Sequence, residues 1–306
     1  MGEVRALIVA PTLDDAARAF LHNYEKIGSD GTRRVYRIAL NQMIERFGAQ
    51  ATLGVLDDPA AGERFRAWFR EAFAGAKPRT RAGKLAALQS AFGWWRLQGW
   101  MVTDPTQGLT RPSIPRDRTR VHGTEEVEAL WERQDVPLRE KTLWRMLYET
   151  AARCEEILTL NVEDLDLPNK RARVRRKGGT IDRVFWQTGT ARLLPRLLEG
   201  RQRGPVFLAD RKPRGPVATA DLCPVTGRAR LSYRRAHEVL HAMTGWTLHD
   251  FRRAALSHDS DQGTPIPMLM ARSGHSSFRS LEPYIRTSEA ALARHVAASD
   301  PAARRR

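Results

Sequence analysis

The chain has 306 residues, 51 of them basic and 35 acidic, and its net charge of +16 favours a polyanion such as nucleic acid as partner. This length exceeds what one hydrophobic core usually fills, which predicts two domains. No stretch has the ~18–20 consecutive apolar residues of a membrane span, and the N-terminus lacks the pattern of a secretory signal. Two isolated cysteines, Cys154 and Cys223, exclude a disulfide framework or a thiolate zinc site. We therefore expect a cytoplasmic protein.

The first part of the chain predicts a small all-helical domain, residues 1–112. Apolar residues recur there at intervals of three to five positions, as they do along one face of a helix. Helices are predicted over residues 12–27, 31–47, 62–73 and 81–99. The last helix must end before Asp104-Pro105, because a residue that precedes proline is disfavoured in the helical conformation.

A basic linker is predicted over residues 113–122. The stretch from Arg111 reads RPSIPRDRTRVH, with two prolines, four arginines and almost no apolar residue, so it cannot form a core. Three of its arginines are predicted to contact DNA: Arg116, Arg118 and Arg120.

The second domain, residues 123–306, is predicted to combine helices with a small antiparallel sheet. A helix begins at Thr124 with acidic residues in its first turn, and another spans residues 138–151. The segment RARVRRKGGTIDRVFW alternates on either side of Gly178-Gly179, which is typical of a β-hairpin. Helices return from about Leu231. The fold class is therefore mainly α with a small antiparallel β-sheet.

Several side chains of this domain match the needs of phosphodiester cleavage without a metal. Such a reaction requires an oxygen nucleophile, fixed cations around the phosphate and a proton donor for the leaving oxygen. The candidates, in chain order, are Arg153, Lys177, His249, Arg252, His275 and Tyr284.

The order and context of these six residues resemble the tyrosine recombinase, or phage integrase, family. The shared pattern is an arginine that opens a helix, a lysine on a hairpin, His-x-x-Arg in LHDFRRAAL, and Gly-His followed nine residues later by a tyrosine. The first domain is similar to the helical core-binding domain of the family, so the resemblance covers nearly the whole chain. It implies a site-specific recombinase or integrase of prokaryotic, phage or mobile-element origin, associated with the nucleoid.

The resemblance implies a role for each catalytic residue. Tyr284 would attack phosphorus and form a 3′-phosphotyrosine, with His249 as its proton acceptor, so that no metal, ATP or other cofactor is needed. Arg153 and Arg252 would hold the non-bridging oxygens, because a guanidinium matches the geometry of phosphate.

Three more roles complete the implied site. Lys177 would protonate the leaving 5′ oxygen, and His275 would donate a hydrogen bond to the phosphate. Glu156, three residues after Arg153 and on the same helical face, would support the site. The helix that leads to His275 is predicted to begin near Met268, because two prolines precede it.

Two other motifs could indicate a metal site, but each fits its metal-dependent class poorly. His237-Glu238-Val239-Leu240-His241 matches the H-E-x-x-H pattern of zinc proteases, but the further ligands of that class are missing at the required spacing. In the family interpretation this helix faces DNA through Arg234 and Arg235. Asp164 and Asp166 could suggest a metal-dependent nuclease, yet acidic residues commonly mark such turns.

Double-stranded DNA is the expected partner, gripped by both domains. Residues 1–112 carry 16 basic against 11 acidic side chains, and the remainder carries 35 against 24, so both domains attract the same polyanion. We expect a monomer in solution and a tetramer on paired DNA sites, with the C-terminal helix docking on a neighbouring protomer. A type IB topoisomerase-like enzyme and a catalytically silent DNA-binding protein are the alternatives.

Overall fold

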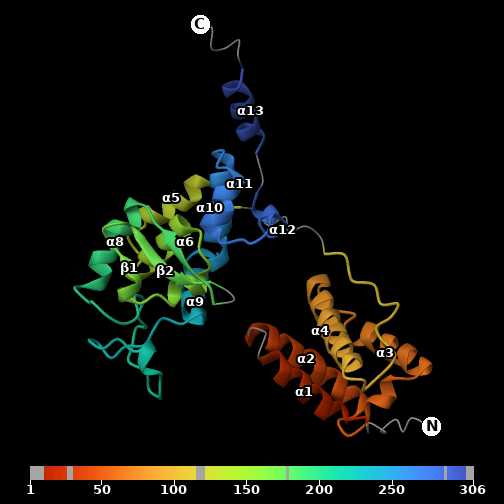
Figure 1. Ribbon diagram of the computed structural model, residues 1–306. Helices are drawn as coiled ribbons and strands as arrows, with labels where there is room; N and C mark the ends of the chain where they lie inside the picture. Colours follow the sequence, from red (N-terminus) through yellow and green to blue (C-terminus); the bar gives the residue numbers. More distant parts are fainter. Residues whose placement is uncertain (1–9, 26–29, 115–120, 177–178, 286–287, 301–306) are drawn as a thin grey trace, which may run out of the picture. The chain divides into compact units, whose positions relative to one another are not determined.

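The structure is a computed structural model that describes residues 10–25, 30–114, 121–176, 179–285 and 288–300. The chain divides into two compact units, one within residues 1–116 and the other within residues 117–306 (Figure 1). The predicted DNA contacts Arg116, Arg118 and Arg120 lie outside the described residues. No helix in the described part of the chain is long and apolar enough to cross a membrane.

The first unit is all-helical. A 3₁₀ turn, Leu53–Leu56, joins the second and third helices, and the bounds of the helices are α1, Leu13–Glu25; α2, Asp30–Phe47; α3, Pro59–Ala72; and α4, Pro78–Leu97. Their apolar faces meet in one core. Trp95 lies at its centre and donates its indole N–H to the carbonyl oxygen of Ala16 at 3.0 Å, which ties α4 to α1. The tryptophans of α4 therefore serve packing, as their amphipathic context indicates.

Local capping fixes where the third helix begins. The Asp58 carboxylate accepts a hydrogen bond from the backbone N–H of Ala61 at 2.7 Å, and Pro59 occupies the first helical position. The helix therefore starts three residues earlier than the apolar periodicity predicts.

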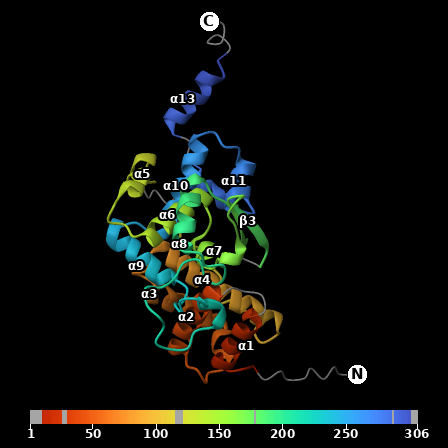
Figure 2. The same cartoon turned by 90° about the vertical axis from the view of Figure 1, so that its left-hand side faces the viewer.

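The second unit packs helices around a three-stranded sheet, and Figure 2 shows its elements from another side. The helices that precede or flank the sheet are α5, Thr124–Glu132; α6, Leu138–Thr150; α7, Cys154–Leu158; and α8, Thr188–Leu198. Helices α9, Tyr233–Thr244, and α10, Leu248–Asp261, follow, and α6 packs against both α8 and α10. Glu149 of α6 is buried and accepts the backbone N–H groups of Gln187 and Thr190, which caps the start of α8.

The predicted hairpin is present in the sheet. Its strands are β1, Leu165–Asp166; β2, Arg171–Arg175; and β3, Ile181–Phe185, all antiparallel in the order β1-β2-β3. Ala172 and Val184 face each other on the buried side, whereas Arg173 and Arg183 are paired on the exposed side. The fold class predicted from the sequence, mainly α with a small antiparallel sheet, is confirmed.

Short helices flank the two C-terminal catalytic candidates, His275 and Tyr284. They are α11, Ile266–Ser273; α12, Phe278–Leu281; a 3₁₀ turn, Glu282–Tyr284; and α13, Glu289–Ala298. His275 lies between α11 and α12, and Tyr284 lies in the 3₁₀ turn. Helix α11 begins at Ile266 rather than near Met268, because Pro265 takes the capping position and Pro267 is accepted in the first turn. Leu256, Leu269 and Leu281 form a small core beneath α10, α11 and α12.

The end of α8 stores backbone strain at an exposed residue. Glu199 caps the helix with φ of 50°, in the left-handed region that L residues with a Cβ avoid. We predict that Glu199→Gly raises the free energy of unfolding by about 0.5–1 kcal/mol, because relief of this strain exceeds the entropy cost of glycine. Urea unfolding measures the change, and Glu199→Ala, which keeps the Cβ, is the control. A glycine variant no more stable than the alanine variant would contradict the strain.

Candidate active site

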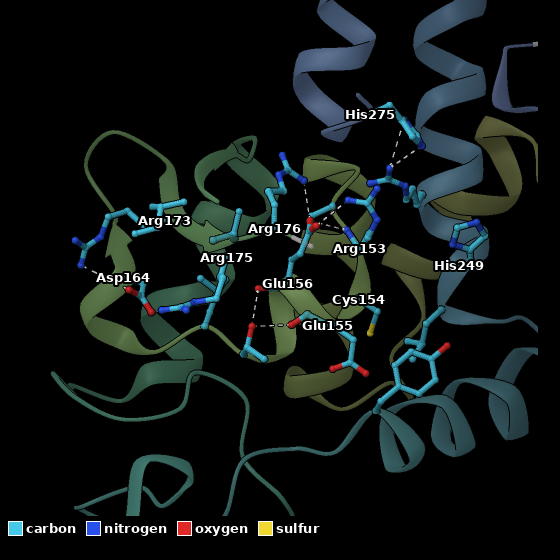
Figure 3. A pocket seen from close by; sticks show the side chains of 18 of the residues that line it. Arg153, Cys154, Glu155, Glu156, Asp164, Arg173, Arg175, Arg176, His249 and His275 are labelled. Carbon is cyan, nitrogen blue, oxygen red and sulfur yellow. Dashed lines mark hydrogen bonds and ion pairs between the residues drawn. The ribbon is translucent and has the colours of Figure 1, made fainter. Parts of the chain in front are cut away.

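An open cleft of about 1160 Å³ lies within the second unit. Helix α7, strand β2, the start of α10 and the segments around His275 and Tyr284 line it. Figure 3 shows arginine, glutamate and histidine side chains converging there from these elements. The cleft is rich in cations, which suits it to an anionic ligand.

Arg153 is held at the start of α7 by Glu156. Its backbone N–H donates to Glu156 Oε2 at 3.0 Å, and its Nη1 donates to Glu156 Oε1, also at 3.0 Å. The carboxylate is 4% exposed, whereas the Arg153 side chain is 38% exposed. Glu156 therefore fixes the guanidinium at the surface of the cleft, where further N–H groups can reach a ligand.

Arg252 comes from α10 and is 2% exposed. Its Nη1 donates to the carbonyl oxygen of Ala151 at 2.6 Å, and its Nη2 lies 3.1 Å from Nε2 of His275. Burial, followed by the charge of Arg153, lowers the pKa of Arg252 to about 10. The guanidinium thus stays charged near neutral pH although water reaches it poorly.

His249 and Tyr284 form a hydrogen-bonded pair. The distance between His249 Nε2 and Tyr284 Oη is 3.0 Å. Burial, followed by the charges of Arg253 and Arg252, lowers the pKa of His249. A neutral imidazole at this distance can accept the phenol proton. Ser257 fixes the tyrosine from behind, because its hydroxyl donates to the backbone carbonyl oxygen of Tyr284 at 2.9 Å.

His275 is held in one tautomer by its two neighbours. Arg252 donates toward Nε2, so Nδ1 carries the proton and donates to Ser273 Oγ at 2.7 Å. The Ser273 hydroxyl in turn donates to the carbonyl oxygen of Leu269 at 2.6 Å. Burial, followed by the charge of Arg252, lowers the pKa of His275 to about 4. This histidine is therefore neutral in the free protein near neutral pH.

The structure brings most of the predicted site residues together, and one of the six lies outside the described residues. Arg153, His249, Arg252, His275 and Tyr284 line the cleft, with Glu156 among them. Lys177 belongs to the residues that the structure does not describe.

The two arginines predicted on α9 do not line the cleft. The Arg234 side chain is 89% exposed and pairs with Glu238 on the same helix. Arg235 pairs with Asp210 and lines a different cavity, of about 510 Å³. Their role in DNA binding stays a prediction.

Sequence reasoning missed Arg176, which lines the cleft and is 8% exposed. Its Nη1 donates to Glu156 Oε2 at 2.7 Å, so Glu156 serves two arginines (Figure 3). Sequence reasoning also missed Arg173 and Arg175, which line the cleft beside it. The alternation of Arg173 and Arg175 along β2 could have indicated these two residues from the sequence. Arg176 stands out in no local pattern.

The H-E-x-x-H motif gains no further ligand in the structure. The rings of His237 and His241 stack along α9 with centroids 5.7 Å apart, and Glu238 is engaged by Arg234. The described residues contain no group of three or more His, Cys, Asp or Glu side chains that could hold a metal ion. The expectation of chemistry without a metal remains a prediction.

Comparison with known proteins agrees with this geometry. The profile of the phage integrase family matches residues 121–291. Tyrosine recombinase XerC of Mycobacterium sp. (strain JLS) is 26% identical over 293 residues, which cover 88% of this chain and 92% of that protein. Tyrosine recombinase XerC of Mycobacterium tuberculosis (strain ATCC 25177 / H37Ra) is 26% identical over 283 residues, 85% of this chain and 89% of that protein.

Solved structures show the same fold. The Tn1549 transposon integrase, in complex with circular intermediate DNA, superposes with a TM-score of 0.65 at 14% identity, over 94% of this chain and 99% of that one. A lambda integrase tetramer bound to a Holliday junction gives a TM-score of 0.66 at 13% identity, over 90% and 83% of the two chains. The family match and the relatives thus define a tyrosine recombinase, and the fold agrees. The chain belongs to the phage integrase family.

The lowered pKa of His275 predicts a pH dependence of stability. Because the folded pKa is about 4 and the unfolded value is 6.5, the unfolded chain binds more protons between these values. Stability is therefore lost as pH falls from 6.5 toward 4. We predict that His275→Gln, which cannot take up this proton, loses less stability over that window than the unsubstituted chain.

Urea unfolding at several pH values between 4.5 and 7.5 measures this difference. His241→Gln replaces an exposed histidine of α9 outside the cleft and is the control. If the His275→Gln variant and the unsubstituted chain follow parallel curves, the proposed environment of His275 is wrong.

Proposed function

We propose that this tyrosine recombinase cuts and rejoins DNA at a specific site through a covalent bond to Tyr284. The observation that carries the proposal is the 3.0 Å contact between His249 Nε2 and Tyr284 Oη, in a cleft that also presents Arg153 and Arg252. A nucleophile paired with its base next to two guanidinium groups meets the needs of phosphoryl transfer.

In the proposed reaction the phenol oxygen of Tyr284 attacks the scissile phosphorus while its proton passes to His249. The bond from phosphorus to the 5′ oxygen breaks, and that oxygen takes a proton from Lys177. Arg153 and Arg252 stabilise the charge on the non-bridging oxygens. The 3′-phosphotyrosine conserves the energy of the ester, so a 5′ hydroxyl can reverse the reaction without ATP, a metal or another cofactor.

His275 must change its hydrogen bonds when DNA binds. In the free protein its Nε2 faces an Arg252 donor, so it offers no proton toward a phosphate. An arriving phosphate would attract Arg252 and raise the pKa of His275, because the anion stabilises the imidazolium. The protonated Nε2 then donates to a phosphate oxygen. This histidine therefore becomes a phosphate ligand only when the phosphate is present.

The exposed face of the hairpin supports DNA binding. Arg173 and Arg183 are direct neighbours across β2 and β3, and both are exposed. Like charges directly opposite one another destabilise a sheet, and Asp164 offsets part of this repulsion by pairing with Arg173 at 3.6 Å. A polyanion laid across both arginines would offset more of it. We therefore include this face in the DNA contact, together with the linker arginines and both units of the chain.

Helix α13 supports assembly on DNA. Leu292 and Val296 lie one helical turn apart and are 57% and 61% exposed. Exposed apolar side chains on one helical face are typical of a surface that another chain covers. We propose that α13 docks on a neighbouring protomer and that four protomers assemble on paired sites, although the free chain is a monomer.

We predict that Tyr284→Phe abolishes covalent adducts with DNA and changes the Kd for DNA less than about 3-fold, because it removes one oxygen and almost no surface. The substrate is a nicked duplex carrying a site selected from random-sequence DNA by binding to the chain. Adducts are scored on denaturing gels, in EDTA and without nucleotide. Tyr233→Phe is the matched control, because Tyr233 also lines the cleft.

The expected result is adduct formation by the unsubstituted chain and by Tyr233→Phe, and none by Tyr284→Phe. Adducts that persist in Tyr284→Phe and vanish in Tyr233→Phe would move the nucleophile to Tyr233. A strict requirement for magnesium would favour a metal-dependent nuclease that uses Asp164 and Asp166. A chain that binds DNA and never forms adducts would be the silent DNA-binding protein.

A further inference from the structure

Arg176 is a buried cation whose position stability alone does not explain. It directly follows β2 and is 8% exposed. Its Nε donates to Asp182 Oδ2 at 3.1 Å and its Nη1 to Glu156 Oε2, but Nη2 is buried without a hydrogen-bond partner among the described residues. Burying an incompletely paired guanidinium is costly, and an apolar side chain of similar volume often stabilises such a place equally well. The contacts of Arg176 point to another reason for its presence.

Through the first contact, Arg176 shares the carboxylate of Glu156 with Arg153. The side chain of Arg153 uses Oε1 at 3.0 Å, whereas Arg176 uses Oε2 at 2.7 Å. With a donor on each oxygen the carboxylate cannot rotate, so the guanidinium of Arg153 keeps one orientation. Because Arg176 takes part of the negative charge, Arg153 is not fully neutralised and retains its attraction for a phosphate.

The second contact holds the turn that carries His275. Nη1 of Arg176 lies 3.4 Å from the carbonyl oxygen of Ser273. Gly274 has φ of 65°, and a Cβ built on it would lie 2.5 Å from Cζ of Arg176. The guanidinium therefore packs directly against the backbone of the residue before His275, closer than any side chain at position 274 would allow.

The third contact joins the end of β2 to the residues that precede β3. The backbone N–H of Arg176 donates to the carbonyl oxygen of Thr180 at 2.8 Å, and the N–H of Gly179 donates to the carbonyl oxygen of Arg176 at 3.0 Å. Arg176 is the residue that immediately precedes Lys177 in the sequence. One residue thus connects α7, the turn after α11 and the hairpin.

We propose that Arg176 is a positioning residue, which holds Arg153 through Glu156 and the His275 turn through Ser273 and Gly274 without contacting DNA itself. The proposal rests on the proposed function, because it concerns the phosphate site of that reaction. It assigns to a buried arginine an effect on the rate of cleavage rather than on DNA affinity.

The test compares single-turnover adduct formation by Arg176→Met, Arg176→Lys, Glu156→Gln and the double variant Glu156→Gln/Arg176→Met on the nicked duplex. Arg201→Met is the matched control, because Arg201 is also 8% exposed but binds the carbonyl oxygens of Pro205 and Val206 and lines the other cavity. DNA Kd and Tm are measured for each variant.

We expect Arg176→Met to cleave about 10–100-fold more slowly, the range for groups that orient a directly acting side chain, with the Kd for DNA changed less than about 3-fold. Arg176→Lys should recover part of the rate, because lysine keeps the charge but not the fork of donors. The double variant should lose less rate than the product of the two single losses, since part of the effect of Arg176 acts through Glu156. Arg201→Met should lower Tm and leave the cleavage rate of the folded protein unchanged.

Other results would overturn the proposal. Additive rate losses in the double variant would show that Arg176 does not act through Glu156, and a loss of DNA affinity equal to the loss of rate would make it a DNA contact. If Arg176→Met does not fold, Arg176→Lys decides, and its unchanged rate overturns the proposal. Absence of adducts with the unsubstituted chain and with Arg201→Met would instead refute the proposed function, and the proposal with it.

Discussion

Positive charges are held close together in the cleft against their mutual repulsion. Arg153, Arg176 and Arg252 approach one another around the buried carboxylate of Glu156. The repulsion is visible in the lowered pKa of Arg252 and of His275, to which neighbouring arginines contribute after burial. Such an arrangement costs free energy in the empty protein, and in the proposed function a bound phosphate would offset that cost. The arginines are therefore in place in the free protein, whereas His275 must exchange its hydrogen bond with Arg252 before it can donate to a phosphate.

Hydrogen bonds to the backbone hold the side chains of the cleft in place. Ala151 ends α6 with φ of 51°, a strained conformation for alanine, and its carbonyl oxygen accepts a hydrogen bond from Arg252. Because α6 packs against α10, which carries Arg252, this contact links the two helices at the site. Ser257, also on α10, holds the backbone of Tyr284 through a hydrogen bond to its carbonyl oxygen. The positions of Arg252 and Tyr284 in the cleft thus depend on the core of the second unit.

Much of this organisation could be predicted from the sequence, because it depends on local patterns. The periodicity of α2 and α4, the Gly-Gly hairpin and the spacing of the site residues are all properties of short segments. Helix ends were less predictable, since the cap at Asp58 and the proline at 265 act through single residues. Arg176 could not be singled out among 51 basic residues, because its partner Glu156 lies 20 positions away and only the fold joins them.

The link between the cation cluster and a phosphate can be measured most directly on His275. NMR titration of the Tyr284→Phe variant, free and bound to an uncut duplex carrying the selected site, reports the pKa of this imidazole in both states. We predict that site DNA raises this pKa well above its free value of about 4, and that an unrelated duplex raises it less. A pKa that site DNA leaves unchanged would contradict the placement of the scissile phosphate in this cleft.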